Sequence, residues 1–303
     1  MASLSIPIRQ TTRTTLLDSS PTGILIASDG REPSDAALIA ARKLAPHGTL
    51  GVLSVVPSSP PGARMPDARM RDSRMGATSE EVGDQTELAA LIEAQLHLLF
   101  GESPDVRVET SSGYPPAVIA SYAALHETRL LITGIGRARV IERLRGDEST
   151  LTLVRLTKTP VLAVAAGSCV PPRRIVVAMD FTPASLRAAR LALELAAPHA
   201  DVIVAHVCPK TEPLSPDGSI RRVVDDLEIG FNGRITPHIL HGDPATEVLT
   251  LANAWPADLI AIGLHDHDRD ERVGIGAVAT RVIRCASCAV VVAPRDARGA
   301  TGR

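Results

Sequence analysis

The stretch ILIASD at Ile24–Asp29 returns 151 residues later as IVVAMD at Ile175–Asp180. Each is a short apolar run that ends in an acid, and such runs are typical of strands buried on both faces of a sheet. Further along the chain the pattern matches again, because Leu130–Gly134 returns as Leu259–Gly263. Solenoid units are only about 20–50 residues long. The longer repeat therefore indicates a duplicated domain.

Short apolar runs alternate with helical patterns in both copies. In the first copy we expect strands at Gly23–Ser28, Thr49–Val56, Val106–Ser111, Leu130–Thr133 and Val161–Ala165, and helices at Ser34–Leu44, Asp84–Phe100, Pro116–His126 and Ser149–Thr157. In the second copy we expect strands at Ile175–Met179, Val202–Val207, Arg234–Leu240, Leu259–Ile262 and Ala289–Val292, and helices at Pro183–Ala197, Pro244–Asn253 and Gly276–Cys285. This alternation predicts an α/β fold with right-handed crossovers. The expected architecture is two tandem, doubly wound, parallel five-stranded sheets, Rossmann-like with strand order 3-2-1-4-5 and helices on both faces.

Domain boundaries follow from the repeat and from breaks in composition. We expect a disordered N-terminal segment at 1–20, a first domain at 21–166, a linker at 167–173, a second domain at 174–295 and a tail at 296–303. The first helix of the second domain has a clear start signal, because Thr182-Pro183 predicts an N-cap followed by Pro at the first helical position. In the first domain Ser34 and Asp35 follow Pro33 at the corresponding place.

The first copy has an insertion of about 22 residues between its second and third strands, since the repeat offset falls from 151 at the first strand to 129 at the fourth. The extra residues lie within Pro57–Glu87, a Pro- and Arg-rich stretch in which Arg-Met recurs every five residues. We expect a mobile loop here, because surface loops accommodate insertions at little cost. A partner-docking segment or a lid is the alternative interpretation.

Composition excludes several classes of protein. Hydrophobic residues make up 45% of the 303-residue chain, enough for two cores, but only six residues are aromatic, so we expect aliphatic cores. The formal charge of −2 and the shortage of rings on which bases stack argue against a nucleic-acid partner. No apolar run reaches about 18 residues, and the first 20 residues lack the apolar core of a signal peptide. We therefore expect no membrane span and a cytoplasmic location.

Two short clusters contain the residue types of metal or redox sites. Cys285 and Cys288 have CxxC spacing, but they lie where a helix runs into the last strand, and no second CxxC completes a zinc set. We interpret both as buried small hydrophobic residues. The run His265–Asp268 combines imidazole and carboxylate, which suits divalent ions, although we expect an exposed polar loop and no metal. His206 and His238, on strands, are expected in the core or the crevice.

A ligand site is expected where the strand order reverses, beyond the carboxyl ends of strands one and four. Asp29 and Gly134 lie there in the first copy, and Asp180 and Gly263 lie there in the second. The acid can accept hydrogen bonds from a ribose hydroxyl or an adenine amine. A glycine lets backbone N–H groups approach phosphate beside a helix N-terminus. No nucleophile elbow or Walker A spacing appears, so we expect no catalytic residues.

With these features the chain resembles the universal stress protein family, and the resemblance extends from Gly23 to Ala293. Besides the two first strands it rests on Gly242-Asp243-Pro244, Asp258–Gly263, Ser287–Val292 and, in the first copy, Lys158–Leu162. The resemblance implies a tandem, UspA-type protein with an α/β fold. It also implies that the last strands, Val161–Ala165 and Ala289–Val292, pair antiparallel. Both are apolar edges that invite pairing.

Many members of that family bind ATP through Gly-x-x-Gly, nine residues, then Gly-Ser or Gly-Thr, and both copies depart from this pattern. The first copy reads Gly134-Ile135-Gly136, nine residues, then Gly146-Asp147. The second reads Gly263-Leu264-His265-Asp266, nine residues, then Gly276-Ala277. A carboxylate beside the phosphates repels the ligand. The first copy keeps three glycines with one residue deleted, although Asp147 replaces the hydroxyl, whereas the second has lost both its second glycine and the hydroxyl. We therefore expect any ATP site in the first copy rather than the second.

The candidate nucleotide-binding residues are Asp29, Gly134, Gly136, Arg137, Gly146 and Ser149 in the first copy, and Asp180, Gly263 and Gly276 in the second. Three further arginines, Arg139, Arg143 and Arg145, lie in the same loop as Arg137. They either meet phosphates or pair with neighbouring acids in a solvated loop.

Three functional hypotheses follow. The leading one is a non-enzymatic stress-response or regulatory module with a degenerate nucleotide site. The second is an ATP-binding sensor switch that uses the first copy. The third, from a different class, is a metal-dependent hydrolase that uses His265–Asp268. We expect the two copies to pair with each other within the chain through their final strands. We also expect a further homodimer, and protein partners that the sequence does not identify.

Overall fold

The computed structural model describes residues 23–57, 79–101, 105–136, 149–208, 217–264 and 276–294. The first copy contains β1 (Ile24–Ala27), α1 (Glu32–Leu44), β2 (Leu50–Pro57), α2 (Ser79–Phe100), β3 (Val106–Gly113), α3 (Pro115–Leu125), β4 (Leu130–Ile135), a helix at 149–156 and β5 (Val161–Ala165). The second contains β6 (Arg174–Ala178), α5 (Pro183–Leu195), β7 (Asp201–Cys208), α6 (Asp217–Glu228), β8 (Arg234–His241), α7 (Pro244–Ala254), β9 (Leu259–Gly263), α8 (Ala277–Cys285) and β10 (Ala289–Ala293).

The strands of the described ranges form one sheet in the order β3-β2-β1-β4-β5-β10-β9-β6-β7-β8. Within each copy all pairs are parallel, and each copy follows the predicted order 3-2-1-4-5. Between the copies β10 lies antiparallel to β5, with Val290 opposite Ala163 and Val291 opposite Leu162. The two predicted five-stranded sheets are therefore continuous across this junction.

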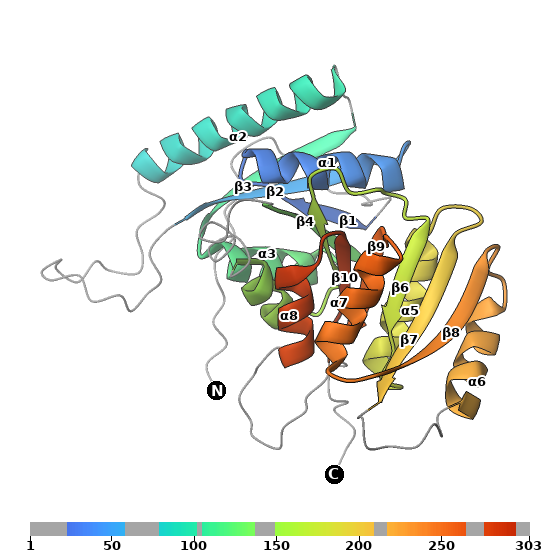
Figure 1. The fold of residues 1–303 in the computed structure, drawn as a ribbon. Coiled ribbons are helices and arrows are strands. Elements are labelled where there is room, and N and C mark those ends of the chain that lie inside the picture. Colours follow the sequence, from blue (N-terminus) through green and yellow to red (C-terminus); the bar gives the residue numbers. More distant parts are fainter. Residues whose placement is uncertain are drawn as a thin grey trace, which may run out of the picture.

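Helices cover both faces of the sheet, as predicted. One face packs against α1, α2, α5 and α6, and the opposite face packs against α3, residues 149–156, α7 and α8. Figure 1 shows α1 and α2 above the first-copy strands and α3 below them. The core is aliphatic, with fully buried side chains such as Ile26, Leu131, Ile175 and Ile260, in keeping with the near-absence of aromatic residues.

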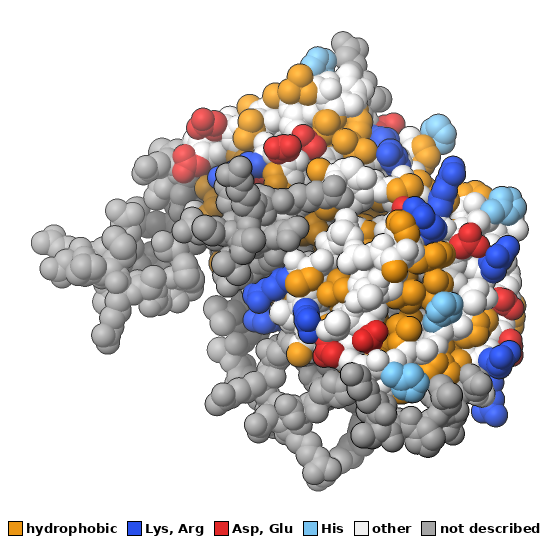
Figure 2. Space-filling model, viewed as in Figure 1, with side chains coloured by type: hydrophobic (Ala, Val, Ile, Leu, Met, Phe, Trp, Pro, Cys, Tyr) orange, Lys and Arg blue, Asp and Glu red, His pale blue; other side chains and the backbone are white. Residues whose placement is uncertain are grey.

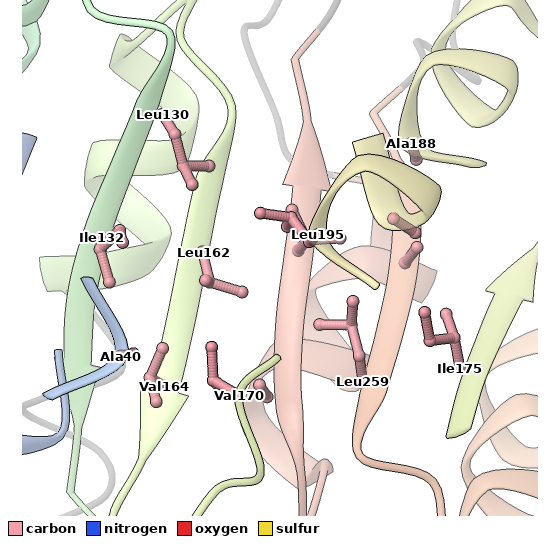
Figure 3. Close-up of a cluster of buried hydrophobic side chains, with 14 of the residues drawn as sticks. Ala40, Leu130, Ile132, Leu162, Val164, Val170, Ile175, Ala188, Leu195 and Leu259 are labelled. Carbon is pink, nitrogen blue, oxygen red and sulfur yellow. The ribbon is translucent and has the colours of Figure 1, made fainter. Parts of the chain in front are cut away.

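The segment between the copies contributes to the core. Val170 is 7% exposed and belongs to the same hydrophobic cluster as Leu162 and Leu259. Figure 3 shows Val170 between β5 of the first copy and Leu259 of the second. Because an apolar side chain from this segment is buried in the core that the copies share, the linker stabilises the arrangement of the copies as well as connecting them.

Three sequence predictions need correction. Helix α2 begins at Ser79 rather than at Asp84, so residues 79–83 of the expected loop are helical; Val82 in this turn is exposed, and an exposed apolar residue does not give the periodic pattern of a buried face. Residues 58–78, the rest of that loop, lie outside the described residues. Helix α1 begins at Glu32 rather than at Ser34. Helix α6 was not predicted, although Ile220, Val224 and Leu227 have helical spacing and are all buried.

Charged side chains are distributed without a single dominant sign. Figure 2 shows Lys and Arg interspersed with Asp and Glu over the described part of one face. Within the described ranges, every helix is too short or too polar to cross a membrane.

Candidate functional site

The strand order reverses between β1 and β4 in the first copy and between β6 and β9 in the second. We call the carboxyl ends of each strand pair, with the loop that follows, the first and second reversal points. The loops are the β1–α1 loop, residues 28–31, and the β6–α5 loop, residues 179–182. Since β5 and β10 are antiparallel, the two reversal points lie at opposite edges of the sheet.

Asp29 closes the β1–α1 loop. Its Oδ1 accepts hydrogen bonds from the Ser34 hydroxyl at 2.7 Å and from the Arg31 amide at 3.1 Å. Its own amide donates to Ser34 Oγ at 3.2 Å. The second carboxylate oxygen, Oδ2, lies 3.9 Å from Arg31 Nε, beyond hydrogen-bond distance. The Asp29 side chain is 59% exposed, so Oδ2 keeps acceptor capacity toward solvent.

Asp180 closes the β6–α5 loop in a similar way. Its Oδ1 accepts from the Thr182 amide at 3.0 Å and from the Thr182 hydroxyl at 2.6 Å, and its amide donates to Ser185 Oγ at 3.4 Å. Ser34 and Ser185 are both buried. In both copies, therefore, the strand-end acid and a buried serine fix the start of the following helix.

Gly134 and Gly263 have a packing role at the reversal points. A Cβ on Gly134 would lie 1.7 Å from the carbonyl oxygen of Pro33, and one on Gly263 would lie 2.3 Å from the amide nitrogen of Ser185. The first turns of α1 and α5 thus lie directly on these strands. The spacing of these glycines suggested an approach of the backbone to phosphate, but close helix–strand packing requires them on its own.

Of the remaining candidate nucleotide-binding residues, the structure describes three. Gly136 is half-buried just after β4, and Ser149 is exposed at the start of the described helix 149–156. In the second copy Gly276 is the N-cap of α8, and the helix begins at Ala277. Because glycine has no side chain, this helix start has no side-chain cap. Arg137, Gly146, the other loop arginines and His265–Asp268 lie outside the described residues.

The two loops are held by different neighbours. Thr182, the N-cap of α5, accepts a hydrogen bond from the Ser185 amide, as its sequence predicts. The equivalent N-cap of α1 is Arg31, whose side chain makes no such bond. Instead, Gln95 of α2 reaches the loop and the first turn of α1. Sequence reasoning missed Gln95, because it comes from a helix more than 60 residues away.

The end of each first strand is also held from the next strand. The Ser54 hydroxyl donates to the Ser28 carbonyl at 2.6 Å, and His206 Nδ1 lies 2.7 Å from the Met179 carbonyl. A carbonyl can only accept, so Nδ1 of His206 carries the proton. The His206 ring packs against Phe181 with a centroid distance of 4.6 Å. His206 and His238 are both half-buried on strands.

Two groups away from the reversal points have shifted pKa values. The hydroxyl and amide of Thr246 both donate to Asp243 and lower the pKa of this carboxyl, with a smaller contribution from Arg281. Arg281 approaches at 2.8 Å, but both side chains are more than half exposed, so water screens the pair. Burial, followed by a hydrogen bond to Glu109, raises the pKa of Tyr122.

The CxxC interpretation was only partly correct. Cys288 is buried, as expected, but Cys285 is exposed at the end of α8, because the helix turns its last residue toward solvent before the chain enters β10. Across the described ranges, His, Cys, Asp and Glu do not cluster in any group of three that suits a metal ion.

The comparison with known families matches this architecture. The model of the universal stress protein family fits residues 22–165 and again 172–294. The chain belongs to the universal stress protein family. It carries the family's domain twice in tandem, which explains the internal repeat.

Individual relatives share 18–28% of their residues with this chain. Universal stress protein MJ0531 of Methanocaldococcus jannaschii is 28% identical over 137 residues, which cover 40% of this chain and 81% of the relative. A universal stress protein from Archaeoglobus fulgidus has a similar fold, with a TM-score of 0.66 at 18% identity over 91% of this chain and 99% of that one. A universal stress protein solved in complex with cAMP is 25% identical, with a TM-score of 0.35, over 41% of this chain and 97% of that one.

Proposed function

We propose that this universal stress protein is a non-enzymatic regulatory module of the stress response, with a degenerate nucleotide site at its first reversal point. The proposal rests on the contacts and the exposure of the Asp29 carboxylate. Oδ1 holds the loop, while the side chain as a whole is 59% exposed and its Oδ2 makes only a long ion pair, 3.9 Å from Arg31 Nε. A ribose hydroxyl or an adenine amine can donate to that oxygen.

Two features favour the first copy over the second. Behind Gly134 the first copy offers a second glycine, Gly136, and an exposed hydroxyl, Ser149, at the described start of the following helix. The second copy has Asp266 in the sequence at the place of the second glycine, and its α8 begins with Ala277. Hydroxyls and amides at a helix N-terminus suit phosphate oxygens, whereas a carboxylate repels them. The first copy also has a carboxylate in this pattern, Asp147, but it keeps its glycines.

Calorimetric titration tests the site. Wild-type protein titrated with ATP up to about 1 mM should bind one molecule per chain. Asp29→Ala should abolish the heat of binding, while the matched variant Asp180→Ala should leave it unchanged. Absence of any heat, or binding that Asp29→Ala does not alter, rejects the site. Titration with cAMP in parallel separates a general adenine-nucleotide site from one that needs the triphosphate.

The non-enzymatic part of the proposal needs its own assay. We expect phosphate release from ATP to proceed at the rate of the protein-free control, since hydrolysis requires a positioned base and a metal-bound phosphate. Release that depends on protein concentration, and that a divalent ion stimulates, would support the hydrolase hypothesis instead.

We also propose that the antiparallel pairing of β5 and β10 makes the chain an internal pseudo-dimer in solution. Ala163 and Val290 face each other across this pair, and opposed residues on antiparallel strands lie within disulfide range. The double variant Ala163→Cys and Val290→Cys should form an intramolecular disulfide under mild oxidation. Each single variant controls for pairing with the natural cysteines. Formation of crosslinked dimers in place of the intramolecular bond would indicate pairing between chains.

A further inference from the structure

The β1–α1 loop lacks the local support that its counterpart has. In the second copy Thr182 caps α5, with its hydroxyl oxygen 3.2 Å from the Ser185 amide. The residue 151 positions earlier is Arg31, which gives α1 no side-chain cap. Replacing a hydroxyl cap by a residue that cannot cap destabilises the start of a helix. The loop that presents Asp29 keeps its local bonds to Ser34 but has no cap, so a contact from another helix adds support that the second copy does not need.

Gln95 of α2 provides this support. Its Oε1 accepts from the Ser28 hydroxyl at 3.3 Å, and its Nε2 donates to the Arg31 carbonyl at 3.3 Å and to the carboxylate of Asp35. Gln95 is 8% exposed. The three partners flank Asp29 on both sides along the chain, so a single buried amide ties both ends of the loop to α2, in addition to the local bonds of Asp29 and Ser34.

A second contact presses α2 onto the same loop. Gly30 has a φ of +74°, and a Cβ there would lie 2.6 Å from Leu91 Cδ2 and 3.5 Å from Ile92 Cδ1. The second copy has Phe181 at the position of Gly30 and Leu186 at the position of Asp35. Its loop therefore carries a large side chain where α2 contacts Gly30, and it lacks the carboxylate that Gln95 uses.

We propose that α2 controls the ligand competence of the first reversal point, with Gln95 as the positioning residue that replaces the missing N-cap. When α2 is docked, Ser28, Arg31 and Asp35 are held together and Asp29 presents Oδ2 in one orientation. When α2 moves away, all three bonds are lost at once, and the loop gains the freedom of an uncapped helix start. The part that concerns nucleotide rests on the function proposed above.

Hydrogen–deuterium exchange without nucleotide tests the positioning. In Gln95→Leu, amides within residues 28–35 should exchange about tenfold faster, the effect of about 1.4 kcal/mol of lost hydrogen bonding. Residues 179–186 of the second copy should not change. Adding Arg31→Thr, which copies Thr182, should return the exchange of residues 28–35 toward the wild-type rate; Arg31→Thr alone is the control.

A second variant protects the test against misfolding. Asp35→Leu copies Leu186 of the second copy and removes one Gln95 partner while leaving α2 intact, so it should accelerate the same amides. Unchanged exchange in both Gln95→Leu and Asp35→Leu overturns the proposal. Acceleration that Arg31→Thr does not reverse overturns it too, because it assigns Gln95 to general packing.

ATP affinity, measured on the same variants, separates this inference from the proposed function. Gln95→Leu should weaken ATP binding about tenfold, and Arg31→Thr should restore it. Exchange rates that follow the prediction in a protein whose wild type binds no ATP would refute the nucleotide site and support the positioning by Gln95. ATP affinity that is equal in the wild type and in Gln95→Leu, despite faster exchange, overturns the control by α2.

Discussion

The β1–α1 and β6–α5 loops follow equivalent strands and carry equivalent acids, yet they are held by different means. Thr182 holds its loop from within, through a hydroxyl three residues from the amide it bonds. Gln95 holds the other loop from 60 to 67 residues away. A local cap makes a loop independent of the rest of the domain, whereas a remote amide ties the loop to the position of another helix.

The largest expected effect on stability concerns the reversal-point glycines, which the two copies share. Gly134→Ala places a methyl group 1.7 Å from a backbone oxygen, so it should lower the free energy of unfolding by about 3 kcal/mol, at the upper end of overpacking costs. Gly263→Ala should cost a similar amount. Urea denaturation measures both.

A glycine with open surroundings is the control for this prediction. Gly83, inside α2, has no atom within 4 Å of the position that a Cβ would occupy, so Gly83→Ala should stabilise the protein by about 0.5–1 kcal/mol. If Gly134→Ala is as mild as Gly83→Ala, the first turn of α1 does not lie on β4 as described.

The next largest effect is expected in the first copy and has no counterpart in the second. Gly30→Ala introduces a side chain at a φ of +74° and against Leu91, and we expect a loss of about 1–2 kcal/mol. Adding Leu91→Ala should recover the steric part of this loss but not the backbone part. Phe181, at the equivalent place, already tolerates a φ of 62°. Equal stability of Gly30→Ala and the wild type would show that α2 does not cover the loop.

Alkaline pH should weaken the first copy through Tyr122. Burial and Glu109 raise the pKa of the folded phenol. Its contribution is therefore fully present below the unfolded pKa of about 10 and is lost as pH rises above it, because the unfolded phenol then ionises first. At pH 11 the wild type should have lost about 1 kcal/mol from this group, and Tyr122→Phe should not. Parallel pH profiles for the two proteins would contradict the assignment.

Acid should weaken the second copy by a smaller amount through Asp243. Hydrogen bonds from Thr246 lower its pKa below 3.8, so its contribution is present above that pH and is lost as pH falls through the folded pKa. Asp243→Asn should flatten this part of the acid unfolding curve. Trp255, the single tryptophan, directly follows α7, so its fluorescence reports unfolding of the second copy. An unchanged acid midpoint would remove Asp243 from the account.

Much of the fold could be predicted because it rests on local pattern. Near-continuous apolar runs such as Ile175–Ala178 indicate strands buried on both faces, and Thr182-Pro183 marks the start of α5 correctly. Helix α6 was overlooked because charged residues dominate its sequence, although its buried positions have helical spacing. Such a helix is stabilised mainly by packing of one face on the sheet.

The site was harder to predict because its chemistry depends on contacts between distant residues. The sequence places Asp29 and Gly134 near each other, but it does not show that Pro33 lies against Gly134, and so it cannot separate a packing glycine from a phosphate-binding one. Nor does it connect Gln95 with Ser28, since an insertion and a complete strand lie between them. Local signals identify Thr182 and miss its long-range substitute.

The two reversal points should differ in ligand competence, and hydrogen–deuterium exchange measured with and without ATP distinguishes them. At saturating ATP, amides within residues 28–35 of the wild-type protein should exchange more slowly, while those within 179–186 should keep their rate. Protection of both loops, protection of 179–186 alone, or protection of neither would contradict the account.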